Sequence, residues 1–161
     1  MTATPGVVPE LAQGRAARGT LVVGFDRHPA SLGALGSAAD LGQRMGAALL
    51  VVHVVDLSDY PVDPDRPDWE DKAEQALAEE EAAVAATLAS YPFNWTYEAV
   101  GGDPVNALIA AGVRVDALMV VVGSRGERLH RVMHRLASPS VAHRLIERCG
   151  RPVLVVHPTG G

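Results

Sequence analysis

The chain has 161 residues, of which 48% are hydrophobic, and its formal net charge is −5 at neutral pH. This length is typical of one domain, and this apolar share is enough for a core. No apolar run approaches the ~20 residues of a membrane span, so we expect no membrane partner. A net acidic chain with only 4% aromatic residues is also a poor candidate for nucleic-acid binding.

Residues 1–18 lack the basic start and apolar stretch of a secretory signal, so we expect a flexible tail there. The single cysteine, Cys149, cannot form an intramolecular disulfide and fits a reducing compartment, which predicts a cytoplasmic protein. One domain is expected over residues 19–158, followed by a short tail over residues 159–161.

Strands and helices are predicted to alternate from the start of the domain. The apolar run TLVVGF at 20–25 predicts the first strand, and Pro29 fits the first turn of a helix that ends at Gly46. ALLVVHVV at 48–55 predicts a second buried strand. The apolar residues expected on the inner side of the helix are Leu32, Leu35, Ala39 and Met45.

A loop with three prolines over 56–68 precedes an Ala/Glu-rich helix over 69–90. Apolar side chains then alternate with polar ones from Phe93 to Tyr97, which predicts a strand with one wet face at a sheet edge. In that strand Trp95 is expected to point inward. The residues expected on the inner side of the helix are Ala76, Ala83, Val84, Thr87 and Leu88.

Asp103-Pro104 predicts the start of a helix that ends at Gly112. The Val-rich run at 118–122 predicts a strand that is covered on both faces. Ser138-Pro139-Ser140 is expected to start the last helix, and residues 153–156 form the last strand. Strict alternation with short connections predicts an α/β fold, a single open parallel five-stranded sheet with helices on both faces.

A glycine-containing loop, GSRG at 123–126, follows the Val-rich strand. Glycines there let the backbone turn sharply and approach a bulky ligand. In an open α/β sheet, ligands bind outside the carboxyl ends of the strands. Residues 123–151 also hold seven of the fourteen basic residues, all of them arginine. The sequence therefore predicts an anion-tolerant loop at the ligand-binding edge.

Four segments resemble the universal stress protein family: VVGFD at 22–26, LLVVHVVD at 49–56, VVVGSRG at 120–126 and SVAHRLIERCGRPVLVVHP at 140–158. The resemblance implies a strand order of 3-2-1-4-5, as in adenine nucleotide alpha hydrolase-like folds. It also implies a regulatory role in stress response and a homodimer. We expect the dimer to form along the last strand, because a sheet edge is liable to pair with another chain.

The resemblance further implies an adenine nucleotide ligand, ATP or AMP. Asp26 is expected beside the adenosine, and Leu49 and Val122 are expected beside the adenine. The remaining residues, Val141 among them, are expected around the phosphates. Acidic residues of the 56–68 loop are candidates for holding Mg²⁺ on the phosphates of ATP. The expected binding residues are Asp26, Leu49, Val122, Gly123, Arg125, Gly126, Ser140 and Val141.

The second half of the family's ATP pattern is altered here. The pattern has Gly, two residues, Gly, nine residues, and then Gly-Ser or Gly-Thr. Gly123 and Gly126 match its first half, but counting back from Pro152 puts Pro139 where the third glycine belongs, with Ser140 in the serine position. The loop is then three residues longer, and proline offers no N–H to a phosphate. We therefore predict that affinity for ATP suffers more than affinity for adenosine or AMP.

Two other functions compete with nucleotide-dependent regulation. A nucleotide-free member of the family would act through dimerisation and protein association, which the altered pattern favours. A nucleotidyl-transferring enzyme on a related fold would need an HxGH or SGGxD pattern, which the sequence lacks. Without a convincing general base or catalytic triad, we expect no enzyme beyond slow, incidental ATP hydrolysis.

Histidines give little support for a metal centre. His130 and His134 share a helix face, but Arg131 stands where a zincin motif has its glutamate. We therefore expect no metal site, and Cys149 on an apolar helix side is expected to be buried and inert. Four histidines are interpreted as structural: His28, His53, His143 and His157.

Overall fold

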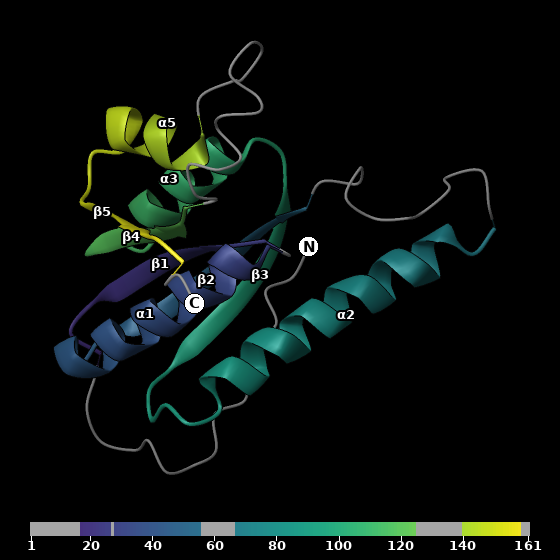
Figure 1. Ribbon diagram of the computed structural model, residues 1–161. Coiled ribbons are helices and arrows are strands. Elements are labelled where there is room, and N and C mark those ends of the chain that lie inside the picture. Colours follow the sequence, from purple (N-terminus) through teal and green to yellow (C-terminus); the bar gives the residue numbers. More distant parts are fainter. Residues whose placement is uncertain (1–16, 27, 56–66, 125–139, 159–161) are drawn as a thin grey trace.

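The computed structural model describes residues 17–26, 28–55, 67–124 and 140–158 (Figure 1). Its strands form one parallel sheet with the order β3-β2-β1-β4-β5. The predicted fold class and strand order are therefore confirmed. The strands are β1 (Thr20–Phe25), β2 (Ala48–Val55), β3 (Trp95–Gly101), β4 (Met119–Gly123) and β5 (Val153–Val156).

Helices cover both faces of the sheet, as Figure 1 shows. One face packs against α1 (Pro29–Met45) and α2 (Trp69–Leu88), and the other packs against α3 (Pro104–Arg114) and α5 (Val141–Arg148). Among the described residues, none of the helices combines the length and apolar character that crossing a bilayer requires.

The central strand β1 shows why its sequence is apolar at nearly every position. Leu21, Val23 and Phe25 face α1 and α2, whereas Val22 faces α3. Side chains alternate across a strand, so a strand with helices on both sides buries consecutive residues. All four side chains are at most 6% exposed.

Helix α1 has the predicted limits but a different inner face. Pro29 occupies its first turn, and Gly46 ends it in a left-handed conformation with φ of 68°. Leu32 and Met45 were expected inside, but they are 44% and 36% exposed. The buried side of the helix is instead made of small residues and one leucine: Ala30, Ser31, Ala34, Leu35, Ala38, Ala39 and Gly42.

Helix α3 corrects a second expectation, because it continues through Gly112 to Arg114. Gly112 is buried within the helix, and its carbonyl accepts a hydrogen bond from the Ala117 N–H at 2.9 Å. The turn comes later, at Asp116, which has a positive φ of 48°. The helix therefore ends where that backbone turn is made and not at the glycine.

The predictions for β3 and α5 are confirmed where the structure describes them, except at Cys149. Strand β3 lies at a sheet edge, Trp95 packs against the core, and Thr96 is exposed. In α5, Leu145 is fully buried, and Val141 and Cys149 pack beside it. Cys149 itself is half-buried rather than buried, and residues 138–139 lie outside the described part of the chain.

Candidate functional site

The carboxyl ends of β1 and β4 form the point where the connections of the sheet diverge. The two strands pair in parallel, with Val23 opposite Val121, and continuing this register brings Asp26 level with Ser124. The chain leaves β1 toward α1 on one face, whereas α5, which follows β4, lies on the other face. Ligands of open α/β sheets settle at such a switch point.

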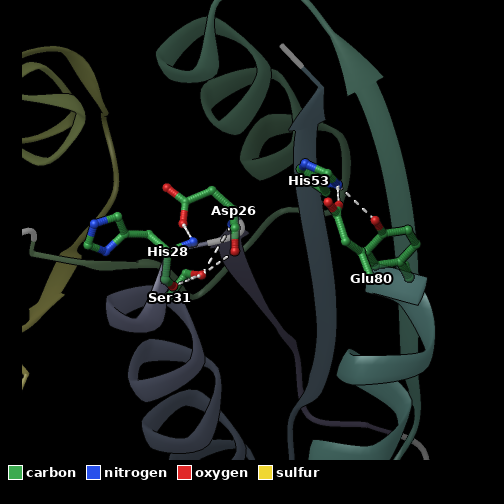
Figure 2. A network of polar contacts seen from close by, with 6 residues as sticks. Asp26, His28, Ser31, His53 and Glu80 are labelled. Carbon is green, nitrogen blue, oxygen red and sulfur yellow. Dashed lines mark hydrogen bonds and ion pairs between the residues drawn. The ribbon is translucent and has the colours of Figure 1, made fainter. Parts of the chain in front are cut away.

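Asp26 lies in a turn that local hydrogen bonds define (Figure 2). Its carboxylate accepts a hydrogen bond from the His28 N–H at 2.8 Å. The Ser31 hydroxyl lies 2.6 Å from the Asp26 carbonyl and 2.9 Å from the His28 carbonyl. An aspartate whose side chain binds the backbone N–H two residues on forms an Asx-turn. The carboxylate is therefore held at the edge of the sheet.

Gly123 is required by packing against the start of α1. A Cβ atom on Gly123 would lie 2.6 Å from the carbonyl carbon of Ala30, and it would also clash with the oxygen of that carbonyl. Backbone atoms cannot rotate out of the way as a side chain can. Glycine at this position thus allows α1 to approach β4, whether or not a ligand is bound nearby.

One backbone N–H group of the expected phosphate loop already donates a hydrogen bond within the protein. The Ser124 N–H donates to the Val156 carbonyl at 2.8 Å and so extends the pairing of β4 with β5. Val122 is 5% exposed and belongs to the core beneath α3 and α5. Arg125 and Gly126, which were also expected to bind phosphate, lie outside the described residues.

The beginning of α5 offers backbone donors at the same edge of the sheet, because a helix between two parallel strands starts at their carboxyl ends. Ser140 is the N-cap, and its hydroxyl accepts a hydrogen bond from the His143 N–H at 3.2 Å. Val141 and Ala142 occupy the first turn, where N–H groups have no acceptor inside the helix. This arrangement suits an anion.

An ion pair connects the start of α5 to the start of α3. Arg144 Nη1 lies 2.9 Å from Asp103 Oδ2, and Asp103 also caps α3 by accepting from the Asn106 N–H at 3.0 Å. The hydrogen bond from Arg144, followed by the one from Asn106, lowers the pKa of Asp103. A second link, between Arg148 and the Asn106 side chain at 2.9 Å, joins the same helices.

Replacing Arg144 with alanine is expected to raise the pKa of Asp103 toward the ordinary value for aspartate, because its strongest hydrogen-bond donor is removed. A carboxyl group with a lowered folded-state pKa stabilises the protein above its unfolded-state pKa. This contribution is lost as the pH falls through the folded-state pKa. Carbon-detected NMR titration of the Asp103 carboxyl measures the change. An unchanged pKa would contradict the prediction, and Arg114→Ala, which breaks the Arg114–Glu98 pair instead, is the matched control.

The sequence profile described as the Universal stress protein family matches residues 18–157. The chain belongs to this family. Among curated proteins, it is 26% identical over 166 residues to the stress response protein NhaX of Bacillus subtilis (strain 168). That alignment covers 84% of this chain and 96% of NhaX.

Solved structures of other universal stress proteins share the fold. One, in complex with cAMP, is 26% identical, with a TM-score of 0.64, and the match covers 89% of this chain and 100% of that one. The universal stress protein UspA from Lactobacillus plantarum is 23% identical, with a TM-score of 0.59, covering 88% of this chain and 99% of that one.

In this universal stress protein, Leu49 is not where the sequence analysis expected it. Leu49 is the second residue of β2 and pairs with Leu21 near the start of β1. His53, four residues later, is the one that pairs with Phe25. At about 3.3 Å per residue, Leu49 lies about 13 Å from that level along the strand. Its side chain belongs to the core beneath α1, so Leu49 does not line the carboxyl edge.

A hollow of about 300 Å³ lies at the opposite, amino edge of the sheet. Its lining includes Arg18, Gly46, Phe93 and Asn94, and the Asn94 carbonyl accepts a hydrogen bond from the Leu49 N–H at 3.1 Å. The switch point, which directs ligands in this class of fold, is at the other edge. The hollow is therefore not the candidate site.

Sequence reasoning missed a buried polar cluster between α2 and the sheet. His53 Nδ1 lies 2.9 Å from the Tyr97 hydroxyl and forms an ion-pair contact with Glu80. The three residues are 3%, 4% and 8% exposed, respectively. Buried polar groups need such partners. A histidine inside the apolar run of β2 was the signal that a buried polar partner had to exist.

Metal ligands were not expected in this universal stress protein. Within residues 17–26, 28–55, 67–124 and 140–158, no group of three or more His, Cys, Asp or Glu side chains is placed to hold a metal ion. His130, His134 and the acidic residues at 56–65 lie outside these ranges.

Proposed function

We propose that this universal stress protein is a cytoplasmic regulatory module of the stress response that binds an adenine nucleotide at the carboxyl ends of β1 and β4. The observation that carries the proposal is the carboxylate of Asp26, fixed by the His28 N–H at the switch point of the sheet. The 26% identical universal stress protein in complex with cAMP supports an adenine nucleotide as the ligand.

Each end of the nucleotide has chemically suitable partners in this proposal. Asp26 accepts hydrogen bonds from ribose hydroxyls, which a carboxylate does well. Val122 is placed beside the base through its backbone, because its side chain belongs to the core. The N–H groups at the start of α5, at Ser140 and Val141, receive the phosphate together with Gly123, Arg125 and Gly126. Mg²⁺ would be needed only with ATP.

The phosphate end of the proposed site offers few backbone N–H donors. The Ser124 N–H is bonded to the Val156 carbonyl, and Pro139 has no N–H. A triphosphate needs more charge-assisted hydrogen bonds than a monophosphate. We therefore propose a ligand with one phosphate, such as AMP, in preference to ATP.

Calorimetry with AMP and ATP tests this proposal. Wild-type protein is expected to bind AMP at least as tightly as ATP, and Gly126→Val should abolish both signals by filling the space that the backbone leaves for the ligand. Gly33→Val is the matched control, because Gly33 faces open space on α1. If neither AMP nor ATP gives a heat signal with the wild-type protein, nucleotide binding is rejected.

Binding rather than turnover is proposed, with at most slow and incidental ATP hydrolysis. The second candidate function is nucleotide-free protein association, and one observation favours it. The commitment of the Ser124 N–H to β5 stabilises the sheet without a ligand. Rejection of nucleotide binding would leave the edge strand β5 as the functional surface.

Strand β5 is suited to pair with a second copy of the chain. It pairs with β4 on one side and is the last strand of the sheet. The carbonyls of Pro152 and Val156 accept hydrogen bonds from β4, so alternation turns the N–H groups of Val153 and Val155 toward the open edge. Open edges with such donors pair with other chains. We propose a homodimer along β5.

Sedimentation equilibrium is expected to show a dimer for the wild type and a folded monomer for Val155→Pro. Proline removes the outward N–H and is tolerated on an edge strand. Ile146→Lys is the control, because Ile146 is an exposed apolar residue that lies on α5 and not on the edge strand. A monomeric wild type at high micromolar concentration would refute the dimer.

A further inference from the structure

The buried polar cluster of Glu80, His53 and Tyr97 lies on the face of the sheet that α1 and α2 cover, beside the end of β1. His53 pairs with Phe25, the last residue of β1, and Asp26 follows immediately. Figure 2 shows the Asp26 turn and the His53–Glu80 contact at the ends of neighbouring strands. The proposed function gives this cluster no role.

A continuous set of contacts leads from α2 to Asp26. The Glu80 carboxylate holds His53 Nδ1, which fixes the orientation of the imidazole ring. The imidazole and the Phe25 ring pack in a T-shaped arrangement, with ring centroids 6.2 Å apart and planes at 89°. Edge-to-face packing of this kind has a preferred geometry. Phe25 directly precedes Asp26, so the imidazole contacts the residue next to the one that carries the carboxylate.

Helix α2 buries Glu80 at the end of its packed stretch that lies nearest the candidate site. Its buried residues are Glu80, Val84 and Leu88, and Glu80 is the first of them along the chain. Because α2 connects the carboxyl end of β2 to the amino end of β3, its earlier turns lie toward the carboxyl edge. Glu80 is thus the buried contact of α2 closest to Asp26.

We infer that Glu80 is a positioning residue for nucleotide binding, acting through His53 and Phe25 on Asp26. The inference deepens the proposed function and rests on it. Val84 serves as the control for a purely structural effect of changing a buried residue of α2. It is fully buried one turn further along the same helix, in the core that α1 and α2 share, and it belongs to no polar contact with His53.

The test compares Glu80→Leu, Glu80→Gln and Val84→Ala with wild-type protein, at a temperature where circular dichroism shows each to be folded. Leucine keeps the apolar burial but cannot hold His53, whereas glutamine keeps a polar contact to Nδ1. We expect Glu80→Leu to weaken AMP binding about tenfold. Glu80→Gln should restore most of the affinity, and Val84→Ala should bind like the wild type. Glu80→Asp, which shortens the side chain, serves if the leucine variant does not fold.

An NMR measurement on the ligand-free protein separates this inference from the proposed function. The backbone amide signals of Asp26 and His28 should shift in Glu80→Leu and remain in place in Val84→Ala. If the wild type binds no AMP, the proposed function fails, and these amide shifts alone decide whether Glu80 positions Asp26. Unchanged Asp26 signals in Glu80→Leu, or an equal loss of affinity in Val84→Ala, would overturn the inference.

Discussion

Replacing Gly123 with alanine is expected to lower the free energy of unfolding by about 3 kcal/mol, at the upper end of the usual cost of overpacking. The added Cβ would lie 2.6 Å from the Ala30 carbonyl carbon and 3.1 Å from the Ser31 backbone nitrogen. Relief requires α1 to move away from β4, which disturbs the core between them. Urea denaturation followed by circular dichroism measures the loss.

The same chemical change at Gly33 is the matched control, because a Cβ there meets nothing within 4 Å. Alanine is favoured over glycine in a helix interior, so Gly33→Ala should stabilise the protein by about 1 kcal/mol. The two alanine substitutions are thus expected to change the free energy of unfolding in opposite directions. A Gly123→Ala variant as stable as the wild type would show that α1 does not lie against β4 as described.

Replacing Glu80 with alanine is the second change with a large expected effect. Removing one partner of a buried polar contact leaves the other group without that partner, which costs about 1–3 kcal/mol. Here the removal also withdraws a partner from the cluster around His53 and Tyr97, which are both buried. We expect a loss of about this size in the free energy of unfolding, and a smaller loss for Glu80→Gln. Urea denaturation again provides the measurement.

Glu79→Ala controls for the general effect of removing a glutamate from α2. Glu79 is exposed, and its carboxylate accepts a hydrogen bond from Gln75 at 3.1 Å. Changes at such surface positions stay within about 0.5 kcal/mol. Equal effects of the two alanine substitutions would show that Glu80 is not buried against the sheet.

The fold could be predicted from the sequence because its signals are local. Unbroken apolar runs mark strands that are covered on both faces, and β1 and β4 have such runs. Pro29, Gly46 and Asp103 mark helix limits through their own backbone preferences. Where a local signal competed with packing it failed, as at Gly112, which stays inside α3 because nothing in that turn requires a positive φ.

The site was less predictable because it depends on contacts between distant segments. In the sequence, Glu80 cannot be distinguished from the other acidic residues of its helix. Its partners, His53 and Tyr97, lie on two different strands. Leu49 was chosen from a segment match that spans the whole of β2. Such a match does not indicate which residue reaches the carboxyl edge, and the parallel register with β1 decides that question.

The most direct test of nucleotide binding at the carboxyl ends of β1 and β4 is to follow backbone amide signals by NMR during titration with AMP. The signals of Asp26, Ser124 and Val141 are expected to shift with increasing AMP, as nucleotide binding at this edge requires. Signals of Ala48 and Asn94, at the opposite edge of the sheet, should remain unchanged. Shifts confined to the amino edge, or no shifts with millimolar AMP, would contradict nucleotide binding at the carboxyl edge.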